Sequence, residues 1–381
     1  MSLERSNQPL RGLRVVEVSQ LIAAPLCGLT LSDLGADVIK VESPHGDYTR
    51  AWAREDQESG IFRMLNRGKR SVLADHRTEH GRTFVRALID SADIVVENHG
   101  DLMQRMYGIE YADAANKRPG LIWCSVSGMG RGVQRKAIDM TLQASMGITA
   151  LTGEADGPPL RGAMPVVDLM TGMAAVQAVL VAVMAVRDGA AGRFIDCAMV
   201  DAAATLTASP GALSLSGFSR PRRMGSENDL FVPSRVFATS DDAHVHVVAI
   251  SEQQWRAICE ATGLTEWVND PRFSSNRRRL EHRAEIHGGL AAVLSTQPAA
   301  HWTTEIAARG GLCERVREIE EAWADPVMRE RGLLLEGSDG QSTPAVALVG
   351  EHLPAAAPVL GEHTERLELE LGLASGATSA S

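Results

Sequence analysis

Asp168 has the residue type and the setting of a catalytic group. It is the only charged residue between Arg161 and Arg187. The β-branched run at 165–167 predicts a short strand that leads into Asp168, and the apolar residues after it predict a long helix. One interpretation of Asp168 is structural, because aspartate is among the best N-cap residues of a helix.

The other interpretation of Asp168 is catalytic. A carboxylate at the carboxyl end of a parallel strand faces the crevice where open α/β sheets bind ligands. The adjacent helix N-terminus would favour its anion, and an ionised carboxylate can attack an activated carbonyl. Gly172, one helical turn further on, is expected to leave room for a bulky substrate.

Basic side chains gather at two places that could flank such a crevice. One group has no acid among its members, and the other surrounds a glycine-rich turn: Arg63, Arg67, Lys69 and Arg70, then Arg131, Arg135 and Lys136. Each group is either a solvated face or a site for a polyanion such as a nucleotide phosphate. Asp139, close to the second group, is either a turn-capping acid or a second active-site acid.

The elements that would position these residues follow an α/β rhythm. A strand at 13–18, a helix at 25–34 and a strand at 37–41 form a βαβ unit, which predicts a parallel sheet covered by helices. Further strands are predicted at 94–97, 121–126 and 194–199. The first strand-to-helix turn lacks the GxGxxG pattern of dinucleotide sites, which disfavours a dehydrogenase.

The chain is predicted to contain a large domain and a smaller one. Residues 1–205 form the first part of the large α/β domain, and the Ser-, Pro- and Gly-rich stretch 206–225 indicates a linker. Residues 226–325 form a small α+β domain, which contains a hairpin and a helix at 252–262 with a Ser251/Gln254 capping box. Residues 326–381 form a C-terminal segment with a possible strand at 345–349.

Composition excludes several classes of protein. The 381 residues carry 38 basic and 48 acidic side chains, a net charge of −10, so nucleic acid is an unsuitable partner. The five scattered cysteines form no metal-ligand pattern, and no metal is expected. The N-terminus lacks a signal-peptide core, and the most apolar stretch is too short to span a bilayer. We therefore expect a cytoplasmic protein with no membrane partner.

Several long sequence motifs are distributed along nearly the whole chain. They include the LRGLRVVEVSQLIAAP start of residues 10–52, FRMLNRGKRSVLAD at 62–75, ADIVVEN at 92–98, and the segments 153–203, 269–286 and 357–373. In these motifs the chain resembles the class III coenzyme A transferases, or CaiB/BaiF family. That family includes formyl-CoA transferase, carnitine CoA-transferase and α-methylacyl-CoA racemase.

The resemblance assigns roles to residues. It implies that Asp168 is the nucleophile, and that Arg105 and Lys136 contact the phosphates of CoA. Lys69 and Arg70 match the NxxKRS segment of the family, and Trp52 matches an active-site tryptophan. The resemblance also implies a Rossmann-like large domain that includes the C-terminal segment, an interlocked-ring homodimer, and CoA or acyl-CoA as co-substrate.

The implied reaction moves CoA between small organic acids through an aspartyl acyl-anhydride and an aspartyl-CoA thioester on Asp168. Ile138 stands where the racemases have a histidine, directly before the acid that matches Asp139, and this difference favours a transferase over an acyl-CoA racemase or epimerase. Glu252 lies near the racemase glutamate, but a first-turn helix acid is the simpler interpretation.

Two further departures concern the substrate pocket. Ile22 replaces a glutamine of formyl-CoA transferase, and the residues 225–229 replace its glycine-rich loop, so specificity for oxalate and formate is not expected. A CoA-binding protein without turnover is a third alternative, against which the retention of Asp168 argues.

Overall fold

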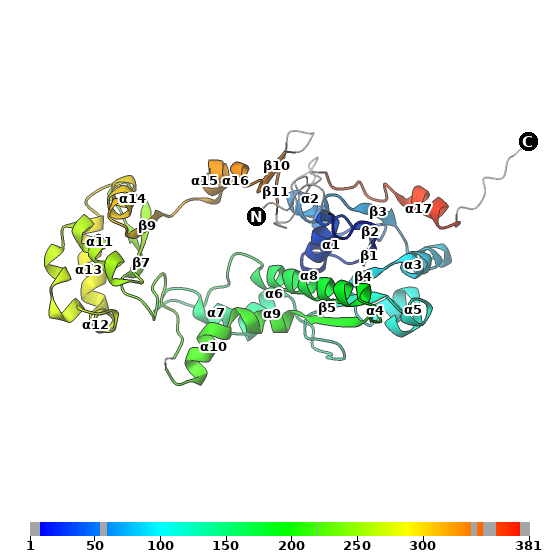
Figure 1. Ribbon diagram of the computed structural model, residues 1–381, viewed down its shortest axis with the longest axis horizontal. Helices are drawn as coiled ribbons and strands as arrows, with labels where there is room; N and C mark the ends of the chain where they lie inside the picture. The colour runs from blue at the N-terminus through cyan, green and yellow to red at the C-terminus, as the bar shows by residue number, and fades with distance from the viewer. Residues whose placement is uncertain (1–7, 54–58, 219, 337–340, 346–355, 374–381) are drawn as a thin grey trace, which may run out of the picture. The chain divides into compact units, whose positions relative to one another are not determined.

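The computed structural model describes residues 8–53, 59–218, 220–336, 341–345 and 356–373. The chain divides into two compact units (Figure 1). Unit 1 comprises Met1–Met146, Gly162–Ala208 and Pro326–Ser381, and unit 2 comprises Gly147–Arg161 and Ser209–Asp325. This division differs from the predicted boundaries, because residues 147–161 belong to unit 2 and the predicted linker contains a helix, α10 (Ala208–Leu215).

A six-stranded parallel sheet forms the centre of unit 1, which confirms the α/β prediction. Its strand order is β3-β2-β1-β4-β5-β6, the order of the doubly wound Rossmann folds. The strands are β1 (Arg14–Val18), β2 (Asp37–Glu42), β3 (Arg70–Leu73), β4 (Ile94–Glu97), β5 (Ile122–Ser127) and β6 (Phe194–Ala198). The strand order reverses between β1 and β4, so the ligand crevice of this fold class is expected at their carboxyl ends.

Helices cover both faces of this sheet (Figure 1). α1 (Ala23–Asp33) and α8 (Val166–Arg187) pack on one face. The other face is covered by α3 (Glu79–Ser91), α4 (Leu102–Tyr107), α5 (Tyr111–Lys117) and α17 (Thr364–Glu370). Both faces of the strands are therefore buried, which explains their continuous β-branched runs.

Shorter elements complete unit 1. They are η1 (Tyr48–Ala51), α2 (Gly60–Asn66), α6 (Asp139–Ser145), α9 (Met199–Leu206), α16 (Pro326–Glu330), β10 (Leu334–Glu336) and β11 (Ser342–Pro344). The strand predicted at 345–349 lies outside the described residues except for Ala345, which is not in a strand.

Unit 2 is the predicted α+β module. Its antiparallel sheet has the order β7-β8-β9, from β7 (Ser234–Ala238), β8 (His244–Val248) and β9 (Leu312–Arg315). The helices are α7 (Ile148–Leu151), α10, α11 (Glu252–Thr262), η2 (Thr265–Val268), η3 (Pro271–Phe273), α12 (Asn276–Glu281), α13 (Arg283–Leu294), α14 (Ala299–Ala308) and α15 (Ile319–Ala324). Both bonds of the Ser251/Gln254 capping box form at α11, as predicted.

α8 is the central helix of unit 1. By length and composition it could cross a membrane. Its buried residues Ala175, Val179 and Ala182 instead belong to the core between the sheet and α1. The opposite side of α8 exposes Met173, Val181 and Met184.

Candidate active site

The first turn of α8 carries Asp168, and its start differs from the prediction. The run at 165–167 is not a strand, because α8 already begins at Val166 and Asp168 lies within its first turn. The cap comes from elsewhere in the chain: Asp139 Oδ2 accepts hydrogen bonds from Val167 N at 2.8 Å and from Asp168 N at 3.2 Å. Asp139 therefore satisfies the amides that an N-cap residue would otherwise serve.

The Asp168 carboxylate is consequently free of a capping role. Its side chain is partly buried, and among the described residues it accepts no hydrogen bond. Burial, reinforced by the negative charge of Asp139, raises the pKa of Asp168 to about 7. This corrects the expectation that the helix N-terminus would favour the anion, since the capping carboxylate of Asp139 opposes that effect. An ionised carboxylate without hydrogen bonds is poorly stabilised, so it is a better nucleophile than a solvated one.

Gln143, which the sequence analysis missed, fixes Asp139 in place. Its Nε2 donates to Asp139 Oδ1 at 2.7 Å and to the Met164 carbonyl oxygen at 3.1 Å, and its Oε1 accepts from Gly162 N at 3.0 Å. One fully buried amide thereby connects α6 to the segment that precedes α8. The i, i+4 spacing of Asp139 and Gln143 on a helix was the available signal.

Gly172 does not leave space for substrate, contrary to the prediction. A Cβ on this residue would lie 2.7 Å from the Ala23 carbonyl oxygen and 2.8 Å from Leu26 Cδ2. Gly172 therefore permits the close packing of α8 against α1.

The loop 19–22 brings Ile22 towards the first turn of α8. Ile22 and Leu169, the neighbour of Asp168, pack against one small apolar cluster formed by Leu26, Leu29 and Leu65. The amide of Asn98 holds this loop, since it donates to Gln20 O at 2.8 Å and accepts from Gln20 N at 3.2 Å.

The other two predicted pocket residues are largely exposed. Ile138 precedes the first residue of α6 and is 50% exposed. Trp52 follows η1 and is 49% exposed. Both side chains remain available for contact with a ligand.

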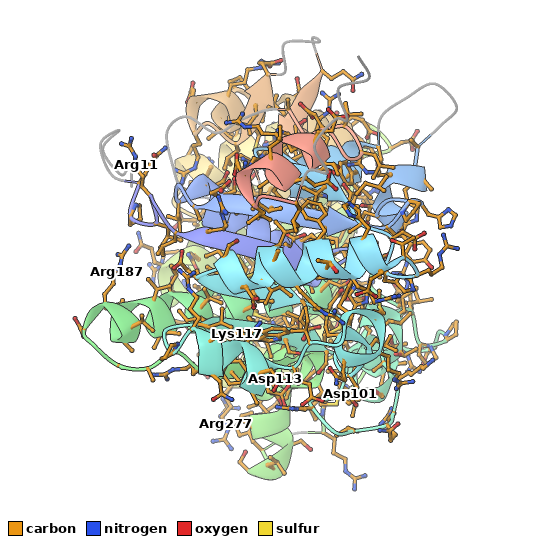
Figure 2. All side chains as sticks on the ribbon, turned by 90° about the vertical axis from the view of Figure 1, so that its right-hand side faces the viewer. Arg11, Asp101, Asp113, Lys117, Arg187 and Arg277 are labelled. Carbon is orange, nitrogen blue, oxygen red and sulfur yellow. The ribbon has the colours of Figure 1, made fainter. Side chains whose placement is uncertain are left out.

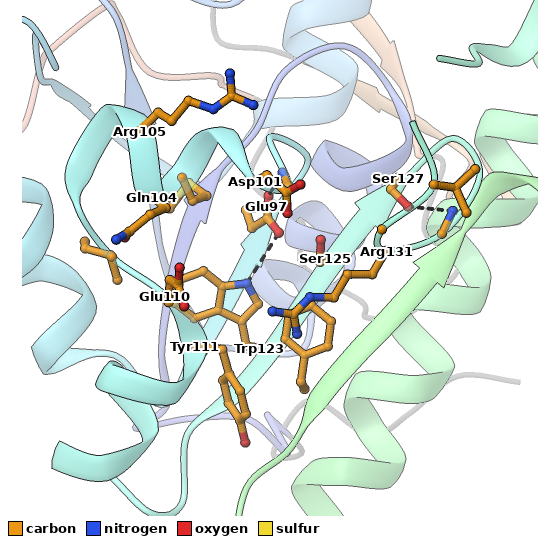
Figure 3. A pocket seen from close by; sticks show the side chains of 17 residues that line it. Glu97, Asp101, Gln104, Arg105, Glu110, Tyr111, Trp123, Ser125, Ser127 and Arg131 are labelled. Carbon is orange, nitrogen blue, oxygen red and sulfur yellow. Dashed lines mark hydrogen bonds between the residues drawn. The ribbon is translucent and has the colours of Figure 1, made fainter. Parts of the chain in front are cut away.

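A cavity of about 370 Å³ opens at the carboxyl ends of β4 and β5 (Figure 3). Trp123 and Phe194 contribute aromatic surface to it, and the Arg131 guanidinium lies 4.7 Å from the centroid of the Phe194 ring. Arg105 also lines this cavity, on α4. Lys136 is exposed in the loop between β5 and α6. Arg105 and Lys136 are thus both accessible to an anion.

Lys69 and Arg70 occupy different surroundings from Arg105 and Lys136. Lys69 is 3% exposed, and its Nζ contacts Glu17 at 2.7 Å and the Pro25 carbonyl oxygen at 2.8 Å. Arg70 begins β3 and pairs with Asp37, which begins β2. Arg70 therefore lies at the amino-terminal edge of the sheet.

Arg70 and Asp168 lie at opposite ends of the parallel strands. In Figure 2 Arg11 and Arg187 lie on the side where the strands begin, and Asp101 lies on the side where they end. Because α8 ends at Arg187, its first turn with Asp168 is at the carboxyl-terminal edge. The structure therefore does not bring Arg70 close to Asp168.

Glu252 and the residues 225–229 both belong to unit 2. The carboxylate of Glu252, in the first turn of α11, forms two 2.8 Å bonds with the Arg279 guanidinium. The Arg279 hydrogen bonds hold the pKa of Glu252 below its usual range, so Glu252 has the contacts of a structural acid. Within this range, Gly225, Glu227, Asn228 and Asp229 line a second cavity of about 310 Å³, together with Leu151 and Pro210.

Taken together, these features describe an α/β fold with a partly buried carboxylate, Asp168, in the first turn of α8 and without a GxGxxG turn after β1. The model of the CoA-transferase family III matches residues 10–364. The chain belongs to this family and is a family III CoA-transferase.

Characterised relatives are similar over nearly the full length of the chain. A succinate–glutarate CoA-transferase of Agrobacterium fabrum is 32% identical, across 95% of this chain and 96% of the relative. An acetyl-CoA:oxalate CoA-transferase of Acetobacter aceti is 31% identical, across 95% of each chain. The crystal structure of a CAIB/BAIF family protein from Brucella suis has a TM-score of 0.85 and 33% identity, over 96% of this chain and 100% of that chain.

Proposed function

We propose that this enzyme transfers CoA from an acyl-CoA to a small organic acid through covalent intermediates on Asp168. The observation that carries the proposal is the Asp168 carboxylate on the first turn of α8, which has no hydrogen-bond partner among the described residues and a pKa raised to about 7. The names of the relatives, which act on succinate, glutarate or oxalate, support a dicarboxylate as donor or acceptor acid.

The proposed reaction begins when an Asp168 oxygen attacks the thioester carbonyl of the donor. The C–S bond breaks, and a mixed anhydride and CoA thiolate form. The thiolate then attacks the carbonyl carbon of Asp168, which releases the donor carboxylate and leaves an aspartyl-CoA thioester. The acceptor carboxylate reverses both steps, so that the new acyl-CoA leaves and Asp168 is regenerated.

Residues in the segments that follow the carboxyl ends of the strands would orient and shield these intermediates. We assign the phosphates of CoA to the accessible cations Arg105 and Lys136. We assign the walls of the acyl pocket to Ile22, Trp52 and Ile138, whose apolar surfaces would exclude the water that hydrolyses an anhydride. Lys69 is placed outside the binding set, because its ammonium is enclosed by internal partners.

A transfer assay tests the proposal against the alternatives. The protein is incubated with succinyl-CoA, oxalyl-CoA or acetyl-CoA and a panel of C2 to C6 carboxylic acids, and the new CoA esters are measured by chromatography. We expect transfer to at least one dicarboxylate. An acyl-CoA racemase would instead exchange the α-proton of its substrate in deuterated water, and a protein without turnover would bind acyl-CoA with neither result.

We further propose a homodimer, which the family resemblance implies. The exposed apolar residues Met173, Val181 and Met184 on α8 support this proposal, as do Leu215 and Phe218, which are 92% and 71% exposed. Sedimentation velocity measures the association directly.

A further inference from the structure

The loop 19–22 connects β1 to α1 at the carboxyl end of β1, and its backbone is strained. Leu21 has a φ of 71°, in the left-handed region that residues with a side chain rarely adopt. Such a conformation persists only where the surrounding contacts enforce it, and strained residues cluster at active sites. The side chains that hold this loop are therefore candidates for a functional role.

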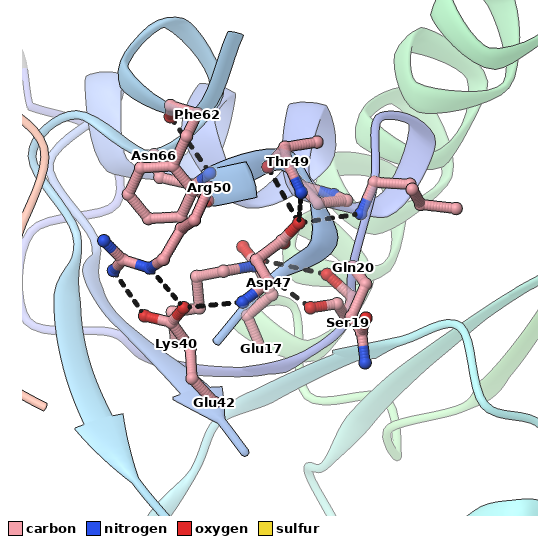
Figure 4. A network of polar contacts seen from close by, with 12 residues as sticks. Glu17, Ser19, Gln20, Lys40, Glu42, Asp47, Thr49, Arg50, Phe62 and Asn66 are labelled. Carbon is pink, nitrogen blue, oxygen red and sulfur yellow. Dashed lines mark hydrogen bonds and ion pairs between the residues drawn. The ribbon is translucent and has the colours of Figure 1, made fainter. Parts of the chain in front are cut away.

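Two buried charged residues form hydrogen bonds with the backbone of the loop (Figure 4). Lys40 Nζ donates to the Ser19 carbonyl oxygen at 3.0 Å, and Asp47 Oδ1 accepts from Leu21 N at 3.3 Å. The same Asp47 oxygen accepts from Thr49 N at 2.9 Å and from Thr49 Oγ1 at 2.8 Å. A single carboxylate thus connects the strained loop to η1.

Asp47 is itself fixed by a buried cluster of charges. Lys40 Nζ lies 2.9 Å from Asp47 Oδ2 and 3.0 Å from Glu17 Oε1, and Lys69 Nζ lies 2.7 Å from Glu17 Oε2. The four side chains are fully enclosed, so two ammonium groups balance two carboxylates. Removing one partner of such a set leaves an uncompensated buried charge, which is strongly destabilising. Each of the four side chains is therefore held in position by the others.

The cluster lies directly under α1. A Cβ on Gly28 would be 1.9 Å from Glu17 Oε2, so the helix backbone rests on the charged groups. Ile22 precedes α1 and shares its apolar cluster with Leu169, which follows Asp168. The charged cluster, the strained loop and the first turn of α8 are therefore connected through contacts within unit 1.

We infer that Asp47 is a positioning residue for the transfer reaction, and that it acts by holding the strained Leu21–Ile22 turn as a fixed wall on the Leu169 side of Asp168. The inference rests on the proposed function. A displaced wall would let the acyl carbonyl of the donor take orientations that Asp168 cannot attack, which lowers the rate of the chemical step more than the affinity for the donor.

Two variants and one control test this role. Asp47→Ala removes every contact of the carboxylate, whereas Asp47→Asn keeps an oxygen that can accept from Leu21 N. The control is Asp33→Asn, which disrupts an equally buried ion pair with Arg67, at 2.5 and 2.7 Å, at the opposite end of α1. All proteins are compared at the same interval below their own Tm.

The readouts are the single-turnover rate of adduct formation at saturating acyl-CoA, the Kd of the acyl-CoA, and hydrogen exchange of the 19–22 amides. We expect Asp47→Ala to lower the rate by roughly 10- to 100-fold with a Kd within about threefold of wild type, and to speed exchange in the loop. Asp47→Asn should restore most of the rate, and Asp33→Asn should change neither rate nor exchange.

Equal rate losses in Asp47→Ala and Asp33→Asn would overturn the inference, because the cluster would then serve stability alone. Unchanged exchange of the loop amides in Asp47→Ala would also overturn it. If wild-type protein forms no adduct while the loop exchange changes as expected, the proposed function fails and the contact between Asp47 and the loop is retained.

Discussion

Two carboxylates at the start of α8 have different environments and therefore different roles. Asp139 accepts hydrogen bonds from the amides of Val167 and Asp168 and from Gln143, whereas the Asp168 side chain accepts none among the described residues. The sequence singled out both acids, but it could not assign the cap to Asp139, because the two residues are brought together by tertiary structure. The spacing of Gln143, four residues after Asp139, was a local signal, but its bonds to Met164 and Gly162 arise only in the tertiary structure.

The raised pKa of Asp168 predicts a pH dependence. In the proposed reaction the attacking species is the carboxylate, so the rate of adduct formation should rise about tenfold per pH unit below 7 and level off above it. Asp139→Asn should move this midpoint to lower pH, because it removes the like charge that raises the pKa of Asp168. Stopped-flow measurements from pH 5.5 to 8.5 at constant ionic strength check both. A midpoint that stays in place or moves upward in Asp139→Asn would contradict the electrostatic effect of Asp139 on Asp168.

The same shift predicts an effect on stability. Because the folded pKa of Asp168 lies above its ordinary value of 3.8, the protonated carboxyl contributes its full stability below about pH 4, and this contribution is lost as the pH rises through 7. Asp168→Asn mimics the neutral form, so it should raise the free energy of unfolding by about 1–2 kcal/mol at pH 8 and leave it unchanged near pH 4. Urea denaturation at the two pH values measures the difference. Destabilisation at pH 8 would contradict the account.

At the scale of elements, the hydrophobic pattern predicted the strands and helices whose type is set by their own local sequence. The β-branched runs of β1, β2 and β4 identified the parallel sheet, because both faces of these strands are buried. β3 was not predicted, since its four residues follow a basic run and carry little pattern. The start of α8 was wrong because Val166 and Val167 favour a strand locally, while the cap from Asp139 selects the helix. The composition of α10 favours a linker, because serine, proline and glycine are common in it.

The contact between α1 and α8 yields a prediction at this scale. Gly172→Ala should destabilise the protein by about 1–3 kcal/mol, because its Cβ would lie 2.7 Å from the Ala23 carbonyl oxygen and force the two helices apart. The control is Gly288→Ala in α13, where no atom lies within 4 Å of the added Cβ. That change should stabilise by about 0.5–1 kcal/mol. Thermal unfolding compares the two, and equal effects would refute the close contact.

At the scale of the whole molecule, the two compact units agree only in part with the domain boundaries predicted from the sequence. The C-terminal segment from Pro326 belongs to unit 1, together with the Rossmann sheet. The assignment of residues 147–161 to unit 2 could not be predicted, because no change of composition distinguishes these residues from their neighbours in unit 1. The motifs of the family, rather than composition or charge, identified the class of enzyme.

The proposed homodimer gives a prediction for the assembly. Val181 is 60% exposed on α8, so Val181→Glu should leave the fold of one chain intact while it places a charge in the proposed interface. We expect a sedimentation coefficient of a dimer for wild type and a shift towards monomer for the variant. A monomeric wild type at micromolar concentration would refute the proposed assembly.

The most direct test of the central claim is intact-mass spectrometry after incubation with succinyl-CoA and other acyl-CoAs. The proteins compared are wild type, Asp168→Asn and the control Asp188→Asn, which changes an exposed carboxylate at the far end of α8. We expect an acyl or CoA adduct that hydroxylamine removes from wild type and Asp188→Asn, and no adduct on Asp168→Asn. An adduct that persists on Asp168→Asn, or CoA transfer by that variant at the wild-type rate, would contradict the assignment of Asp168 as the nucleophile.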